Sequence, residues 1–263
     1  MKAREVLPGV YHLTDAMGVC MTLFVGEKKA VLLDTGYGME NVAEAVRDIT
    51  RLPLQVILTH GHHDHALGAK CFPDVFLLAE DLPVYAKYTN PFWTQRVVGQ
   101  ANGKGVPVPD GYVDRPVAAA HALTEQEMDL GGLHLRFVPC PGHTPGSLVV
   151  WVPDRALLVT GDNWNPTTWV WFREALDVFA YRNNLQSLLK LPFTHVLCSH
   201  DCRLFDRTWI EDFAAALTDA AILAAVPCPE GQEQSIDTVC LPMKRDMHLV
   251  FDRQKAREAR GNG

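Results

Sequence analysis

The stretch THGHHDH at residues 59–65 places four histidines and one aspartate within seven positions of a chain that has only 11 histidines in 263 residues. It follows directly on QVILT (55–59), an apolar run typical of a strand. Residues i and i+2 do not share a helix face, so a loop at the strand end is expected to bring these side chains together. Imidazole and carboxylate groups are typical zinc ligands. The stretch therefore predicts a metal site, with a polar surface patch as the alternative.

Three other apolar runs also end at side chains that can bind a metal. LRFVPCPGH ends at His143, ALLVTGD ends at Asp162 and THVLCSH ends at His200. Polar residues after a strand are common turn formers, so each run is weak evidence alone. Ligands gather at the carboxyl ends of strands in α/β sheets, however, and four such ends together indicate one shared site.

Composition limits the classes of partner. The net charge of −7 argues against nucleic-acid binding, which needs a basic surface. The opening MKAREVLPGVYHL has no apolar signal core, and no run reaches transmembrane length. The seven cysteines are scattered and never spaced C-x-x-C, which is typical of free thiols in a reducing compartment. We expect a cytoplasmic protein that acts on a small molecule without membrane partners; a homo-oligomer is left open.

Alternating patterns predict a single α/β domain over residues 1–263. Helices are expected over 38–51, 174–190 and 206–226. Poor periodicity predicts an irregular insertion at about 81–128, and a C-terminal helix and strand extension begins at about 204. Strands are expected at 10–14, 19–25, 30–34, 55–59, 75–79, 133–138, 147–152, 156–160 and 195–199.

The motifs resemble those of the metallo-β-lactamase-fold hydrolase superfamily, and of its glyoxalase II-like branch in particular. In chain order they are LLDTG (32–36), THGHHDH (59–65), PGHTPGS (141–147), TGD (160–162) and SH (199–200). The resemblance implies a four-layered αβ/βα sandwich with a metal site at one edge of its two sheets. The C-terminal 60 residues depart from the glyoxalase II pattern, so a glutathione thioester is not specifically implied.

The resemblance also implies roles for individual residues. Two divalent ions are expected, zinc above all, with manganese or iron as alternatives. Asp34 is expected to orient a ligand by hydrogen bonding, and His63 fills a variable position and is expected to point away. The implied ligands are His60, His62 and His143 for one ion, Asp64, His65 and His200 for the other, and Asp162 as the bridge.

This ligand set implies hydrolysis. Two ions about 3.5–4 Å apart bring the pKa of a shared water toward neutrality, so that a bridging hydroxide attacks a small ester, thioester or lactone. Asp64 is the expected catalytic residue, because it would orient this nucleophile and accept its proton. The alternatives are a mononuclear iron persulfide dioxygenase, a phosphodiesterase and a non-catalytic metal-binding module.

Aromatic residues beside Asp162 suggest a substrate pocket. Trp164, Trp169 and Trp171 follow this aspartate within ten residues. Such rings can wall an apolar pocket. The alternative is that they simply pack beneath a long loop.

Overall fold

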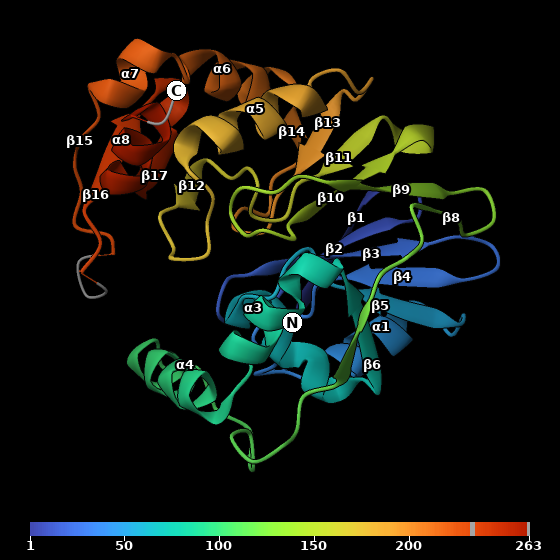
Figure 1. Cartoon of the computed structure of the whole chain (residues 1–263). Coiled ribbons are helices and arrows are strands. Elements are labelled where there is room, and N and C mark those ends of the chain that lie inside the picture. The colour runs from blue at the N-terminus through green and yellow to red at the C-terminus, as the bar shows by residue number, and fades with distance from the viewer. Residues whose placement is uncertain (232–234, 262–263) are drawn as a thin grey trace.

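The computed structural model describes residues 1–231 and 235–261 and contains three β-sheets (Figure 1). The first sheet has the order β1 (Lys2–Leu7), β2 (Val10–Thr14), β3 (Cys20–Val25), β4 (Ala30–Leu33), β5 (Leu54–Ile57), β6 (Asp74–Leu77), β7 (Ala119–Ala122). The second has the order β14 (Phe205–Asp206), β13 (His195–Leu197), β11 (Leu157–Val159), β10 (Leu148–Val152), β9 (His134–Pro139), β8 (Glu127–Asp129). The third has the order β12 (Thr167–Val170), β17 (His248–Asp252), β16 (Thr238–Pro242), β15 (Val226–Pro227).

Helices cover the outer faces of the two large sheets (Figure 1). The α-helices are α1 (Val42–Ile49), α2 (His63–Ala66), α3 (Leu82–Tyr88), α4 (Pro91–Gly103), α5 (Val178–Leu188), α6 (Thr208–Ala216), α7 (Asp219–Leu223) and α8 (Arg253–Gly261). Short 3-10 turns occur at η1 (Leu67–Cys71), η2 (Ala79–Asp81), η3 (Pro153–Arg155) and η5 (Lys244–Asp246). In the part of the chain that is described, no helix is long and apolar enough to cross a bilayer.

The centre of the first sheet is buried on both faces, as β4 shows. Successive side chains of a strand point to opposite faces of the sheet. All four residues of β4 are buried, so both faces of the sheet are covered at this strand. Val31 and Leu33 join the core between the two large sheets, whereas Ala30 and Leu32 pack with Val46 of α1. The helix begins at the cap residue Asn41, whose side chain accepts a hydrogen bond from the backbone N–H of Glu44.

The second sheet is likewise covered on both faces, by the first sheet on one side and by helices on the other. Val150 and Val152 of β10 face the core between the sheets, and Val149 packs with Leu185 of α5 on the outer side. The layers therefore run helix, sheet, sheet, helix, and the predicted αβ/βα sandwich is confirmed.

Parallel pairing places the motif residues at one edge of the sandwich. Strand β4 is parallel to β5, so Asp34 and His60 leave the first sheet at the same end. Strand β11 is parallel to β13, so Asp162 and His200 leave the second sheet together.

The C-terminal extension forms a separate small sheet with the segment that follows Asp162. Strand β12 pairs in parallel with β17, with Trp169 opposite Val250. Strand β16 pairs with β17 in turn, so the C-terminal strands join the sheet of β12 rather than the two large sheets.

Two sequence-based predictions about elements need correction. The segment 81–128 is not irregular throughout, because it contains α3, α4 and β7; α4 begins at the cap residue Asn90, which is followed by Pro91. Only Thr94, Val97 and Ala101 of α4 are buried, so its apolar pattern is short. The helix expected over 206–226 is split, because the Thr218 hydroxyl caps α7. The tail KAREARGNG (255–263), which the sequence predicts to be a frayed helix end, forms the end of α8 as far as Gly261, and its last two residues lie outside the described part of the chain.

Candidate metal centre

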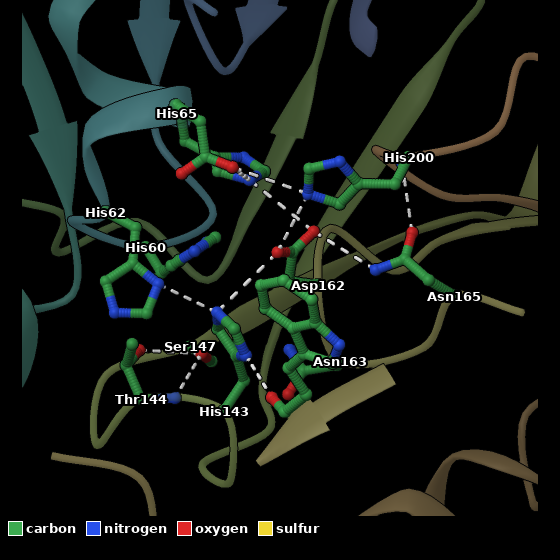
Figure 2. Close-up of polar contacts among 12 residues, drawn as sticks. His60, His62, His65, His143, Thr144, Ser147, Asp162, Asn163, Asn165 and His200 are labelled. Atoms are coloured by element: carbon green, nitrogen blue, oxygen red, sulfur yellow. Dashed lines mark hydrogen bonds and ion pairs between the residues drawn. The ribbon is translucent and has the colours of Figure 1, made fainter. Parts of the chain in front are cut away.

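All seven predicted ligands meet at the sandwich edge. Figure 2 labels all of them except Asp64. The stretch 59–65 is not wholly a loop as expected: His60 and His62 lie in the loop after β5, and α2 begins at His63. Within each of two groups the candidate ligand atoms lie within 4.8 Å of one another. The groups are His60, His62 and His143, and Asp64, His65, Asp162 and His200.

The first group consists of three buried imidazoles. His62 Nδ1 lies 2.8 Å from His143 Nε2, and the ring of His60 lies 4.7 Å from each of the other two rings, centre to centre. His60 Nε2 is buried without a hydrogen-bond partner. A buried polar atom without a partner is costly, and a bound cation would satisfy it.

Asp162 lies between the two groups. Its Oδ2 is 3.6 Å from His143 Nε2 of the first group and 3.1 Å from His200 Nε2 of the second. Its Oδ1 is 3.4 Å from His65 Nε2, an atom that has no hydrogen-bond partner. One carboxylate therefore faces candidate ligand atoms of both groups.

Asp34 and Thr59 hold the outer nitrogens of two histidines. Asp34 Oδ2 accepts from His65 Nδ1 at 2.9 Å, and Asp34 also accepts from the backbone N–H of Thr59 at 2.7 Å. The Thr59 hydroxyl lies 3.0 Å from His60 Nδ1. Asp34 has a positive φ of 65°, which residues other than glycine rarely adopt. Its backbone is therefore strained at the point where its side chain holds His65.

The other two inner histidines are held from more distant segments. His143 Nδ1 donates to the carbonyl of Trp169 at 2.6 Å, and His62 Nε2 donates to Glu174 Oε1 at 2.9 Å. Metal-binding histidines typically bond their second nitrogen in this way, because the bond fixes both the ring and its tautomer. As a result, Nε2 of His60, His65 and His143 and Nδ1 of His62 face inward.

The two groups of histidines differ in their pKa values. Burial lowers the pKa of His60, and it lowers the pKa of His62 to about 4, so both rings are neutral at pH 7. Burial opposes protonation of His65 as well, but Asp162, Asp34 and Asp64 raise its pKa well above the usual range.

The two carboxylates of the second group are ionised. Burial alone would raise the pKa of both, but His65 and His200 hold the pKa values of Asp64 and Asp162 well below the ordinary range. Charged carboxylates and neutral imidazoles are the forms that bind metals, so His60 and His62 already have the binding form, whereas a cation at the second group would displace the proton of His65. Together with the partnerless His60 and His65 nitrogens, this donor set fits two divalent cations.

A pocket of about 390 Å³ opens onto both groups. Trp169 and Trp171 line it, as the sequence predicts, but Trp164 does not. Trp164 is fully buried in the core and packs edge-on against Phe205, because the turn after Asp162 directs its ring inward. His63 was expected to point away; it lines the pocket instead.

Sequence reasoning also missed Asp81, a fully buried carboxylate in η2. It accepts from the backbone N–H of Gly61 at 2.6 Å and of Gly146 at 2.8 Å, and so ties the first histidine loop to the loop that carries His143. A Cβ at Gly61 would lie 2.3 Å from the backbone nitrogen of Tyr85, so only glycine fits there. Gly61 and Gly146 in the two histidine motifs could have indicated a close backbone approach, but nothing in the sequence around Asp81 identified it as their hydrogen-bond partner.

Comparison with known proteins agrees with this geometry. The family described as the metallo-beta-lactamase superfamily matches residues 15–200. The chain belongs to this superfamily. A solved structure of a metallo-beta-lactamase from Pontibacter korlensis is similar with a TM-score of 0.56 and 19% identity, covering 83% of this chain and 99% of that one. At such low identity this likeness shows the fold.

Among curated relatives, the probable metallo-hydrolase YqgX of Bacillus subtilis is 28% identical over 139 residues, 52% of this chain and 62% of that protein. The human acyl-coenzyme A thioesterase MBLAC2 is 29% identical over 154 residues, 52% of this chain and 55% of that protein. Each match thus spans less than two thirds of the relative.

Proposed function

We propose that this protein is a metal-dependent hydrolase that holds two divalent ions, most simply zinc, and cleaves a small ester, thioester or lactone. His60, His62 and His143 would hold one ion, Asp64, His65 and His200 the other, and Asp162 would touch both. Ions bound there would supply an activated water and polarise the carbonyl oxygen of the substrate.

The position of Asp162 carries this proposal. A carboxylate that merely shaped a turn would have no reason to face ligand atoms of two separate groups, yet this one lies within 3.6 Å of His143, His200 and His65 nitrogens. Its Oδ1 also accepts from Asn165 Nδ2 at 3.1 Å, which fixes its orientation.

Asp64 lies where it could accept the proton of the attacking water. Its Oδ2 lies 3.4 Å from His200 Nε2 and 3.7 Å from His65 Nε2, and the residue lines the pocket. A charged carboxylate at this point can orient a water by hydrogen bonding and then accept its proton.

The pocket supports an acyl substrate with an apolar part. Trp169, Trp171, Phe172 and Tyr88 line it, and such rings favour apolar groups. The names of the relatives, a probable metallo-hydrolase and an acyl-coenzyme A thioesterase, support hydrolysis and make thioesters worth testing.

The test combines metal analysis with a substrate panel. Purified protein should carry close to two metals per chain and should hydrolyse at least one of a set of chromogenic esters, thioesters and lactones. One iron per chain, with oxygen consumed on a glutathione persulfide, would instead identify a dioxygenase. Turnover of phosphodiesters alone would identify a phosphodiesterase, and metal without any turnover would identify a binding module.

A further inference from the structure

We propose that Glu174 is a positioning residue that selects the tautomer of His62 and thereby sets the metal affinity of the first group. The proposal rests on the metal site proposed above. Glu174 lies in the segment after β12. It is not part of any of the superfamily motifs quoted above.

His62 differs from the other inner histidines in the nitrogen that it turns inward. His62 faces His143 through Nδ1, whereas His60 and His65 point a partnerless Nε2 into the site. The nitrogen that binds a metal is set by the hydrogen bond that the other nitrogen makes. A carboxylate only accepts hydrogen bonds, so Glu174 at 2.9 Å from Nε2 keeps the proton there and leaves the Nδ1 lone pair free.

Glu174 is itself held in place. Its Oε2 accepts from Lys87 Nζ at 2.9 Å, and the same ammonium group lies 3.3 Å from the hydroxyl of Tyr88. Only 11% of its side chain is exposed. Because one oxygen is engaged by α3, the other stays directed at His62.

The same contacts link His62 to the pocket wall. The rings of Tyr88 and Phe172 each lie 4.6 Å from the His62 ring, centre to centre, and both residues line the pocket. The wall therefore restricts how the imidazole can turn, and Glu174 selects which nitrogen faces inward. Without the carboxylate, no hydrogen bond would fix the tautomer of the His62 ring, which Tyr88 contacts edge-on and Phe172 contacts at a tilt.

The test is Glu174→Gln in the full chain, because glutamine keeps the shape and loses the charge. Zinc binding to the first group, measured by competition with a chromophoric chelator, should weaken by about 10- to 100-fold, as for other changes to groups that hold a metal ligand. In the zinc-loaded protein, ¹H–¹⁵N spectra should show a protected His62 Nε2–H in the wild type, and this signal should shift or vanish in the variant. Lys87→Met should act in the same direction but more weakly.

The control is Glu211→Gln, which removes an exposed carboxylate paired with Arg207 on α6. It should leave zinc affinity and the His62 signal unchanged. If the wild type binds two zinc ions and Glu174→Gln matches it in affinity and spectrum, the positioning role is wrong while the proposed function stands. If the wild type binds no zinc in the first group, both proposals are wrong. Thermal unfolding of each variant shows whether a weaker zinc affinity reflects loss of the fold. If Glu174→Gln does not fold, Lys87→Met tests the hydrogen-bonded link from Lys87 through Glu174 to His62.

Discussion

Asp162 combines two features that a turn residue does not need. It is buried to 92% and yet ionised, because His200 and His65 offset the cost of burying its charge. It also lies three residues beyond the end of β11, and the parallel pairing of β11 with β13 brings it beside His200. Charge and position together make it the most informative single residue to change.

We expect Asp162→Asn to stay folded, to hold about one metal ion fewer and to lose turnover by roughly 10²-fold or more. The amide oxygen can still accept from Asn165, so the turn is kept, but the negative charge between two cations is gone. Metal analysis and kcat measurement check this. Unchanged metal content with near-normal turnover would remove Asp162 from the site, and the two-metal mechanism with it.

The two loops that carry His60, His62 and His143 belong to different sheets. Asp81 in η2 joins them through the backbone N–H groups of Gly61 and Gly146. A carboxylate can accept both bonds at once, and each loop is thereby held relative to the other.

We expect Asp81→Asn to lower the free energy of unfolding by about 1–3 kcal/mol, because the amide nitrogen cannot accept and one buried N–H loses its partner. Urea unfolding measures the loss, and zinc affinity should fall with it because the histidine loops are less well held. Asp74→Asn, in an exposed pair with His121, is the matched control and should change neither quantity. Equal stability of Asp81→Asn and the wild type would show that the loops do not depend on this link.

The tryptophans near β12 occupy two different environments. Trp169 is 40% exposed and lines the pocket, whereas Trp164 is fully buried in the core. The backbone carbonyl of Trp169 holds His143, and this bond survives any change of the Trp169 side chain.

Trp169→Ala should raise KM for bulky apolar acyl substrates about tenfold more than for acetyl substrates, which corresponds to about 1.4 kcal/mol of lost apolar burial. Trp164→Ala should instead destabilise the fold by about 3–5 kcal/mol without such selectivity. Steady-state kinetics across an acyl-length series, with thermal unfolding of both variants, makes the comparison. Equal effects of Trp169→Ala on all substrates would exclude it from the acyl-binding wall.

The proposed metals would also join the two halves of the sandwich. His60, His62, Asp64 and His65 come from the first sheet, and His143, Asp162 and His200 come from the second. A ligand that binds only the folded state stabilises it by mass action, so stability and metal content should change together.

Removal of metal by a chelator should lower Tm and abolish hydrolysis, and zinc should restore both. At free zinc 100-fold above Kd each site contributes about 2.7 kcal/mol. For a chain of this size that corresponds to about 5–10 °C in Tm for each site. Differential scanning calorimetry with and without chelator measures it, and a Tm independent of metal would contradict a cation shared between the sheets.

Local sequence was sufficient to locate the strands and the metal-binding side chains at their ends, and the resemblance of these motifs to the superfamily implied the sandwich fold and the set of seven ligands. Apolar runs mark the strands, and His60, Asp162 and His200 each follow one of them within a few residues. Such signals are short-range, so they can be read without coordinates. The helices α3 and α4 were missed because few of their residues are buried and the apolar period is weak.

Tertiary structure alone decided which more distant groups act on those residues. Glu174 lies 112 residues from His62 along the chain, and Asp81 lies 65 residues from Gly146. The inward turn of Trp164 and the pairing of β12 with β17 likewise depend on packing between remote segments. Ligand identity is local because it needs only a residue type at a strand end. Ligand orientation is not, because the hydrogen bonds that hold each imidazole come from chain segments that meet only when the sheets and helices pack together.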